Sequence, residues 1–148
     1  MTSPAVPLDQ PLYNATFGQA VGRFWRKYAT FSGRASRSEY WWAYLFNVII
    51  GVVLWTFALI FGLSGASVDQ ATGKLVYGPG FVPVMIIAVL WSLAILIPGL
   101  AVTWRRFHDT NKSGAFWFLA FIPVVGEIIV IVLLVLDKDP AGVRFDKR

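Results

Sequence analysis

The sequence predicts an all-α membrane protein with three transmembrane helices, preceded by an amphipathic helix at the membrane interface. The first observation is composition: of 148 residues, 57% are hydrophobic and 14% are charged, and the mean hydropathy is +0.62. Soluble domains average about 45–50% apolar and about 25% charged residues, and a chain this short has too little interior to bury the excess. The second observation is that three apolar stretches each approach the roughly 20 residues a helix needs to cross a bilayer.

Charge and residue types exclude several classes of function. Thirteen Lys and Arg against eight Asp and Glu give a net charge of +5, which suits anionic lipid or nucleic acid. The basic residues are divided among membrane-proximal segments instead of one stripe, so we expect no nucleic-acid partner. With no Cys and one His, thiol chemistry and metal binding lack their usual ligands. We therefore expect no cofactor, no metal and no enzymatic activity.

The chain is expected to begin with a disordered arm, residues 1–15, and to continue as a single membrane domain, residues 16–145. Within residues 17–31, apolar side chains recur at three- and four-residue steps, and most of the cations fall off that stripe. The stripe consists of Phe17, Val21, Phe24, Tyr28 and Phe31. This pattern predicts a helix that lies in the headgroup plane or packs on the cytoplasmic ends of the other helices.

Local motifs predict where the first two membrane-spanning helices begin and end. Ser36 and Glu39 form a capping-box pattern, in which hydroxyl and carboxylate satisfy each other's amide donors, so a crossing is expected at 37–63. A glycine-rich outer loop at 64–80 follows, because its Gly and Pro residues prevent a helix from continuing. The second crossing is expected at 81–106, with a kink at Pro98 and Gly99, and a cytoplasmic loop occupies 107–113.

The distribution of Lys and Arg predicts how the chain is oriented in its membrane. Five cations precede the first crossing and three follow the second, whereas the outer loop has only Lys74. The positive-inside rule therefore puts the N-terminus in the cytoplasm. Aromatic residues are expected to form a belt at the same interface: Tyr40, Trp41, Trp42, Tyr44, Trp104, Phe107, Phe116 and Trp117.

The third apolar stretch, residues 114–136, permits two interpretations. A single crossing kinked at Pro123 and Gly126 would leave the cationic tail, residues 137–148, outside. A re-entrant hairpin, or a fourth crossing, would return the tail and bring 12 of the 13 cations inside. The arms of such a hairpin would measure only about 13 Å, too short to cross. The kinked single crossing is therefore the favoured interpretation.

Two motifs together resemble a known family. They are FSGRASRSEYW at residues 31–41 and RRFHDTNKSG at residues 105–114, and Ile122-Pro123 followed by Gly126 fits the same pattern. The combination is similar to the bacterial inner-membrane proteins of domain of unknown function 805, which include the YhaH-like proteins, over about residues 24–145. The resemblance implies a membrane protein and supplies no reaction. Asn111 stands where the family often has Gly, and Asn also tolerates a left-handed turn.

The candidate site residues are the charged groups beside these helix ends, together with one intramembrane carboxylate. The first set is Arg34, Arg37, Glu39, Arg105, Arg106, His108 and Asp109. Paired guanidinium groups bind phosphate bidentately, so this set is either an anion and lipid-headgroup clamp or an interhelix charge network that joins the cytoplasmic ends. Glu127 lies inside an apolar stretch, where it is either a proton or ion site or the polar turn of a hairpin.

These features favour a non-enzymatic membrane module that binds anionic lipid headgroups or protein partners through a basic, aromatic cytoplasmic face. Other expected partners are a second copy of the chain or another membrane protein. The alternative is a small oligomeric transporter or channel subunit, which rests on Glu127 and on the proline breaks in the apolar stretches.

Overall fold

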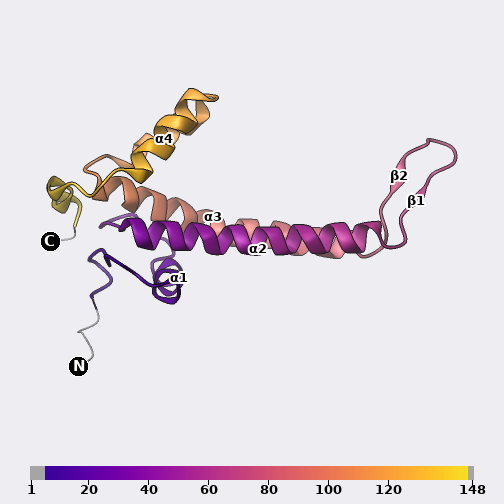
Figure 1. Ribbon diagram of the computed structural model, residues 1–148, viewed down its shortest axis with the longest axis horizontal. Coiled ribbons are helices and arrows are strands. Elements are labelled where there is room, and N and C mark those ends of the chain that lie inside the picture. Colours follow the sequence, from indigo (N-terminus) through magenta and orange to yellow (C-terminus); the bar gives the residue numbers. More distant parts are fainter. Residues whose placement is uncertain (1–5, 147–148) are drawn as a thin grey trace. The chain divides into compact units, whose positions relative to one another are not determined.

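A computed structural model describes residues 6–146, which are mostly helical (Figure 1). The elements in chain order are α1 (Phe17–Arg26), α2 (Arg37–Leu63), β1 (Ser67–Val68), β2 (Leu75–Val76), α3 (Phe81–Asp109), the 3-10 helix η1 (Gly114–Phe121), α4 (Val125–Val135) and the 3-10 helix η2 (Pro140–Phe145). The chain divides into two compact units: Leu45–Leu96, here the apolar unit, and Met1–Tyr44 with Ile97–Arg148, here the charged unit.

The two long helices are α2, with 27 residues, and α3, with 29 residues, and both are long and apolar enough to cross a membrane. At 1.5 Å per residue, each exceeds the roughly 30 Å of a hydrocarbon core. The bounds of α2 match the predicted 37–63. Helix α3 begins at the predicted residue but continues to Asp109, so the loop expected at 107–113 is shorter. Pro98 lies inside α3 without ending it.

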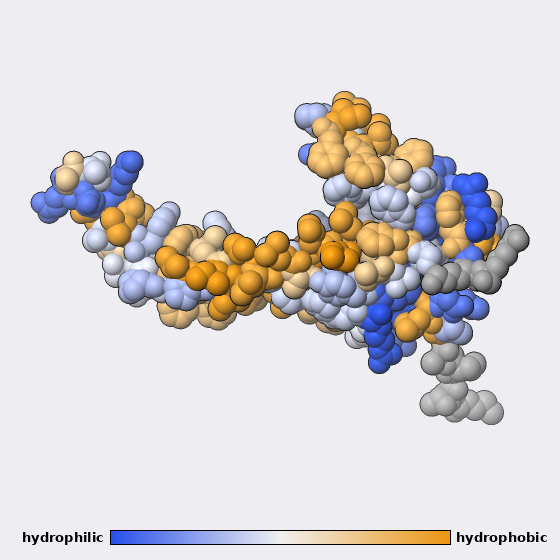
Figure 2. Space-filling view, turned by 180° about the vertical axis from the view of Figure 1, so that it is seen from behind, coloured by the Kyte–Doolittle hydropathy of each residue, from blue (hydrophilic) through white to orange (hydrophobic). Residues whose placement is uncertain are grey.

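The apolar unit contains most of α2, from residue 45 to its end, the first half of α3, to residue 96, and the loop that joins them. Its helical surface is covered with apolar side chains, whereas hydrophilic groups gather on the loop (Figure 2). Phe46 of α2 packs edge-on against Trp91 of α3, with 5.9 Å between ring centroids. The loop, predicted at 64–80 without strands, contains an antiparallel pair in which Ser67 faces Val76. Gly78 is required beside the pair, because a Cβ there would lie 1.9 Å from the Ser64 carbonyl oxygen.

In the charged unit, α1 is shorter than predicted. Thr16 caps it through a complete box with Gln19, and the helix ends at Arg26 instead of residue 31. The reason is the backbone of Lys27, which leaves helical geometry at φ −100° and ψ 35°. Ala20, Arg23 and Phe24 are its buried side chains, whereas Phe17, Tyr28 and Phe31 are exposed. The face that packs inward is therefore only part of the predicted stripe.

Residues 114–136 do not form the single kinked helix favoured above, and a third crossing is not confirmed. Instead η1 and α4 fold back on each other as a helical hairpin with a turn at Pro123 and Val124. Gly126 permits the close approach, because a Cβ there would lie 1.8 Å from the Leu119 carbonyl oxygen. Val124 has φ 64° and ψ −63°, and the Val125 amide donates to the Pro123 carbonyl at 2.7 Å, which is a strained three-residue turn.

The described parts of the arm and of the tail both return to the part of the charged unit where α2 begins and α3 ends (Figure 1). The Gly33 amide donates to the Phe145 carbonyl at 2.9 Å, and the Asp139 amide donates to the Asp109 carbonyl at 2.8 Å. The arm predicted to be disordered is also ordered from residue 6 to 15, because the Ala15 amide donates to Ser38 Oγ and Ser36 Oγ donates to the Leu12 carbonyl. Residues 1–5 of that arm lie outside the described residues.

Candidate functional site

The start of α2 positions a buried carboxylate, Glu39. The predicted capping box is confirmed: the Ser36 amide donates to Glu39 Oε2 at 3.0 Å, and the Glu39 amide donates to Ser36 Oγ at 3.2 Å. Glu39 Oε2 also accepts the Leu12 amide at 3.0 Å, while Oε1 accepts Arg23 Nε. The capping box therefore also positions a buried carboxylate, which accepts hydrogen bonds from Leu12 of the arm and from Arg23 of α1.

Three cations surround this carboxylate, and with Glu39 they form what we call the Glu39 cluster: Arg23, Lys27, Glu39 and Arg105. Arg23 also donates to the Val6 and Pro7 carbonyls at 3.1 and 3.2 Å, and to that of Gln10. Arg105 donates from Nε to the Ala101 carbonyl at 3.1 Å. Burial, and then the charge of Arg105, lower the pKa of Lys27 to about 8. The cluster therefore holds more positive charge than its one carboxylate balances.

A second cluster forms around Asp109 at the end of α3, and we call it the Asp109 cluster: Tyr13, Arg34, Arg106, Asp109 and Asp146. Asp109 Oδ2 accepts Arg106 Nη1 at 2.7 Å, Oδ1 accepts the Tyr13 hydroxyl at 2.9 Å, and Arg34 Nη1 lies 3.7 Å from Oδ1. Arg106 also donates to the Leu134 carbonyl at 3.0 Å and to that of Leu136. Arg106 thereby ties the end of α4 to the end of α3.

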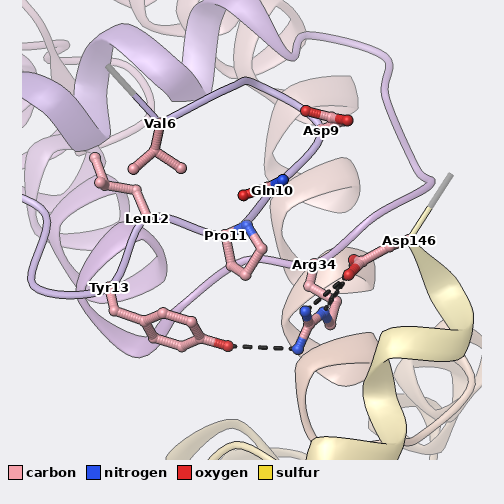
Figure 3. A pocket seen from close by; sticks show the side chains of 8 residues that line it. All are labelled: Val6, Asp9, Gln10, Pro11, Leu12, Tyr13, Arg34 and Asp146. Carbon is pink, nitrogen blue, oxygen red and sulfur yellow. Dashed lines mark hydrogen bonds and ion pairs between the residues drawn. The ribbon is translucent and has the colours of Figure 1, made fainter. Parts of the chain in front are cut away.

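Arg34 joins the Asp109 cluster to the C-terminal tail. Its Nη2 donates to Asp146 Oδ2 at 2.7 Å and its Nε to Oδ1 at 2.9 Å, a bidentate pair that raises the pKa of Arg34. Beside this pair is a 540 Å³ cavity lined by the arm, Arg34 and Asp146, where Tyr13 reaches toward the Arg34 guanidinium (Figure 3). Burial, and then the hydrogen bond to Asp109, raise the pKa of Tyr13 to about 12. The cavity wall therefore carries charges of both signs.

The remaining predicted residues take structural or exposed positions. His108 Nδ1 lies 2.9 Å from the Gly33 carbonyl oxygen, and its ring stacks on Phe145 with 4.0 Å between centroids. Arg37 pairs with Asp137 at the surface. Glu127 lies exposed in the first turn of α4, next to the hairpin turn. Its role as an ion or proton site, and with it the transporter alternative, stays a prediction.

The structure brings the seven predicted residues at the helix ends into one unit. It places Glu39 and Arg105 in one cluster and Arg34, Arg106 and Asp109 in the other, while Arg37 and His108 belong to neither. Arg105 and Arg106 are 1% and 0% exposed, which is incompatible with the open clamp on the membrane surface that their pairing suggested. The reason is that α3 extends to Asp109, so both guanidinium groups turn inward instead of lying on a loop. Phe107, expected in the interfacial belt, is buried for the same reason.

Sequence reasoning missed four members of the clusters: Tyr13, Arg23, Lys27 and Asp146. Arg23 and Lys27 were placed among the cations off the apolar stripe of the predicted helix, although they follow the buried Ala20 and Phe24 at helical spacing. Tyr13 and Asp146 lie in the arm and the tail, where no periodic pattern indicates a contact. The three-residue spacing of Arg23 and Lys27 from the apolar Ala20 and Phe24 was the one sign available in the sequence.

Two helices long enough to span a bilayer, and a unit held together by buried ion pairs, define a small integral membrane protein. The chain belongs to the family described as Protein of unknown function (DUF805), whose family model matches residues 28–147. It is 33% identical over 120 residues to Inner membrane protein YhaI of Escherichia coli strain K12, covering 81% of this chain and 86% of that protein. It is 34% identical over 121 residues to Inner membrane protein YhaH of the same strain, covering 81% and 87%. No solved structure matches the chain.

Proposed function

We propose that this protein is a non-enzymatic module of the bacterial inner membrane that binds anionic lipid headgroups through the exposed cations of its charged unit. The observation that carries the proposal is the distribution of charge. Twelve of the thirteen Lys and Arg, and seven of the eight Asp and Glu, lie in residues 1–44 and 97–148. The net charge of +5 therefore belongs to this unit, where each cation near an anionic surface contributes about 1 kcal/mol to binding.

The carboxylates of the charged unit are largely used internally. Glu39 and Asp109 are buried against Arg23 and Arg106, and Asp146 is bound by Arg34. Other cations reach the surface and are available to headgroups: Arg26, Lys138 and Arg144, with Lys112 half-buried. Internal pairing therefore leaves a surface that is more positive than the composition of the unit alone suggests.

Aromatic side chains support an interfacial position for the same unit. Trp41, Trp42 and Tyr44 are exposed at the start of α2. Trp and Tyr rings are enriched where headgroups meet hydrocarbon, because one edge is apolar and the other can donate a hydrogen bond. Rings and cations in one unit are the combination expected of a segment that contacts both layers of the lipid.

We further propose that the charged unit, with both chain ends, faces the cytoplasm, and that α2 and α3 each cross once. The positive-inside rule supports this orientation. Residues 114–136 would then enter and leave the membrane on the cytoplasmic side. At roughly 16 Å each, by 2.0 Å per residue for η1 and 1.5 Å for α4, the two arms reach about half of the hydrocarbon thickness.

The proposal is tested with the full chain reconstituted in vesicles, where brominated phosphatidylglycerol or brominated phosphatidylcholine quenches the interfacial tryptophans. We expect quenching by phosphatidylglycerol to exceed its bulk fraction and to weaken with salt. Replacing Arg26, Lys112, Lys138 and Arg144 together by Gln should lower this preference by about tenfold or more, because four surface charges are lost.

The control variant is Lys74→Gln, which removes the one cation of the apolar unit and should leave the lipid preference unchanged. Equal quenching by both lipids in the wild-type protein would refute the proposal. So would a quadruple variant that keeps the full preference for phosphatidylglycerol.

A further inference from the structure

Two cationic side chains in the charged unit are buried, and each has a nitrogen of its charged group without a hydrogen-bond partner. Lys27 and Arg105 are 2% and 1% exposed. Among residues 6–146, Lys27 Nζ and Arg105 Nη2 have no acceptor. Buried polar groups almost always have a partner, so two such cationic atoms in one cluster require an explanation.

The nearest carboxylate, Glu39, interacts electrostatically with both cations but is already occupied by other donors. Its Oε1 accepts Arg23 Nε, and its Oε2 accepts the amides of Leu12 and Ser36. Asp9 also acts on Lys27, although more weakly than Arg105 and Glu39. Neither carboxylate supplies the missing acceptor.

The net charge of the cluster, like its unpaired donors, indicates that an anion is missing. Arg23, Lys27 and Arg105 face one buried carboxylate, so the cluster carries two positive charges in excess. An uncompensated buried charge is strongly unfavourable. An anion that accepts hydrogen bonds from both Lys27 and Arg105 would correct the charge and the unmet donors together.

We propose that Lys27 and Arg105 bind one phosphate group between the C-terminal end of α1 and the cytoplasmic end of α3. A phosphate offers several strong acceptor oxygens and carries one or two negative charges, which matches an ammonium with three donors beside a guanidinium edge. A carboxylate or chloride has fewer acceptor positions and at most one charge. The site thus matches phosphate better than the other common anions.

A cavity beside Lys27 provides the access. It has a volume of 190 Å³ and is lined by Leu8, Asp9, Arg26, Lys27, Thr30, Ser32 and Gly33. Thr30 and Ser32 supply hydroxyl donors, and Arg26 supplies a third cation, whereas Asp9 is the one carboxylate on the wall. An anion that enters the cavity therefore meets mostly donor groups.

This inference rests on the proposed function only for the source of the phosphate. A lipid headgroup and free phosphate present the same chemistry to Lys27 and Arg105. The two sources are distinguished by comparing inorganic phosphate with water-soluble dihexanoyl phosphatidylglycerol as probes. Binding of either one through Lys27 supports the site and identifies its source.

The test measures the thermal midpoint of the full chain in a neutral detergent, with phosphate or with chloride at equal ionic strength. At a hundredfold excess over the dissociation constant, phosphate should raise the wild-type midpoint by about 5 °C or more. Lys27→Met should abolish most of this shift. Lys27→Met should also melt higher than wild type without phosphate, because the unpaired buried cation is gone. Arg105→Gln is a second variant and should lose the shift as well.

The matched control is Lys74→Met, which removes the same charge from an exposed position in the apolar unit and should keep the full phosphate shift. Line broadening of the 31P resonance of inorganic phosphate, reversed by sulfate, tests the wild-type chain without any variant. Absence of a shift and of broadening with both probes overturns the inference, and so does a full shift in Lys27→Met.

The two proposals fail in different ways. If phosphate binds through Lys27 but vesicles show no preference for phosphatidylglycerol, the proposed function is wrong and the phosphate site stands. If the lipid preference is present while Lys27→Met keeps the full phosphate shift, the phosphate site is wrong and the proposed function stands.

Discussion

The charged unit and the apolar unit bury opposite kinds of side chain. In the charged unit, the largest fully buried side chains include Arg105, Arg106 and Asp109. In the apolar unit, all of which the structure describes, Ala58 is the one buried hydrophobic side chain, while Val52, Leu90 and Leu93 are about 60% exposed. One unit therefore has charged side chains in its interior beside apolar ones such as Phe24 and Phe107, and the other presents apolar surface outward.

This difference shows that one chain is adapted to two solvents. The apolar unit is stable with its side chains exposed only if hydrocarbon surrounds them, and its helices satisfy their own backbone groups. In the charged unit, buried charges are costly without partners, so the buried carboxylates Glu39 and Asp109 pair with the guanidinium groups of Arg23 and Arg106. We expect the two units to respond differently to labelling, to charge removal, to pH and to loss of single hydrogen bonds.

The largest expected difference is in the side of the membrane that each unit faces. The chain has no Cys, so Ala71→Cys in the apolar unit and Ala141→Cys in the tail each introduce a unique thiol at an exposed position. In intact spheroplasts, an impermeant maleimide should label Cys at 71 and should label Cys at 141 only after permeabilisation. Labelling of both from outside would mean that residues 114–136 cross the membrane.

Removal of a buried carboxylate should be the most destabilising single change. Asp109→Ala leaves the fully buried Arg106 without its partner, and we expect a loss of about 3–5 kcal/mol in the free energy of unfolding. Asp137→Ala, which breaks the exposed pair with Arg37, should cost less than about 1 kcal/mol. Denaturation of both variants in detergent gives the comparison. Equal losses would mean that the interior of the charged unit does not depend on ion pairs.

Stability should rise with pH between the pKa of Lys27 in the folded protein and its higher pKa in the unfolded chain. In this range the folded protein has lost the proton and the unfolded chain still holds it. The pKa of Lys27 is about 8 when folded against an ordinary value of 10.5, so the unfolded chain binds more protons between these values and stability increases with pH. The groups that act on it are Arg105, Glu39, Arg23 and Asp9. We expect a gain of about 2–3 kcal/mol by pH 10.5.

The gain is best measured from pH 7.5 to 10 in phosphate-free buffer. Above pH 10 the raised pKa of Tyr13, about 12, acts in the opposite direction, because its contribution to stability is lost as pH rises through that value. Lys27→Met should remove the slope, and so should saturating phosphate. A slope that persists in Lys27→Met would assign it to another group.

The smallest expected effects come from single side-chain hydrogen bonds in each unit. Thr16→Ala removes the cap of α1, whose hydroxyl accepts the Gln19 amide, and should cost about 1 kcal/mol. Thr56→Ala removes a bond from Thr56 to the Val52 carbonyl within α2 and should change stability by less than about 0.5 kcal/mol, because the carbonyl keeps its helical bond. A larger loss at Thr56 than at Thr16 would reverse the comparison.

Features that depend on neighbours in sequence could be predicted well. The start of α2 followed from Ser36 and Glu39, because a capping box is complete within four residues. The pairing of Arg34 with Asp146 could not be predicted, because 112 positions separate the two and neither belongs to a periodic pattern. The seven candidate residues at the helix ends were found by type and position, but the separation of Arg105 from Arg106, one with Glu39 and the other with Asp109, was not.

The hairpin of residues 114–136 is a second feature that depends on contacts between distant segments. Its apolar composition agrees with a crossing as well as with a fold-back, so the length of the stretch favoured one kinked helix, whereas the structure shows two helices. What separates the two alternatives is close packing of Gly126 on Leu119 and the hydrogen bonds from Arg106 to the carbonyls of Leu134 and Leu136. Both are contacts between segments, and a linear pattern does not contain them.

The sequence by itself determined that two long apolar helices exist, where α2 begins, and that positive charge gathers beside the helix ends. These follow from composition and from interactions between residues a few positions apart, which do not depend on how distant segments pack. Only the tertiary structure decided that Arg105 and Arg106 point inward, that the tail returns to Arg34, and that Lys27 and Arg105 share one buried cluster. The physical reason is that the free energy of a buried charge depends on which distant groups surround it.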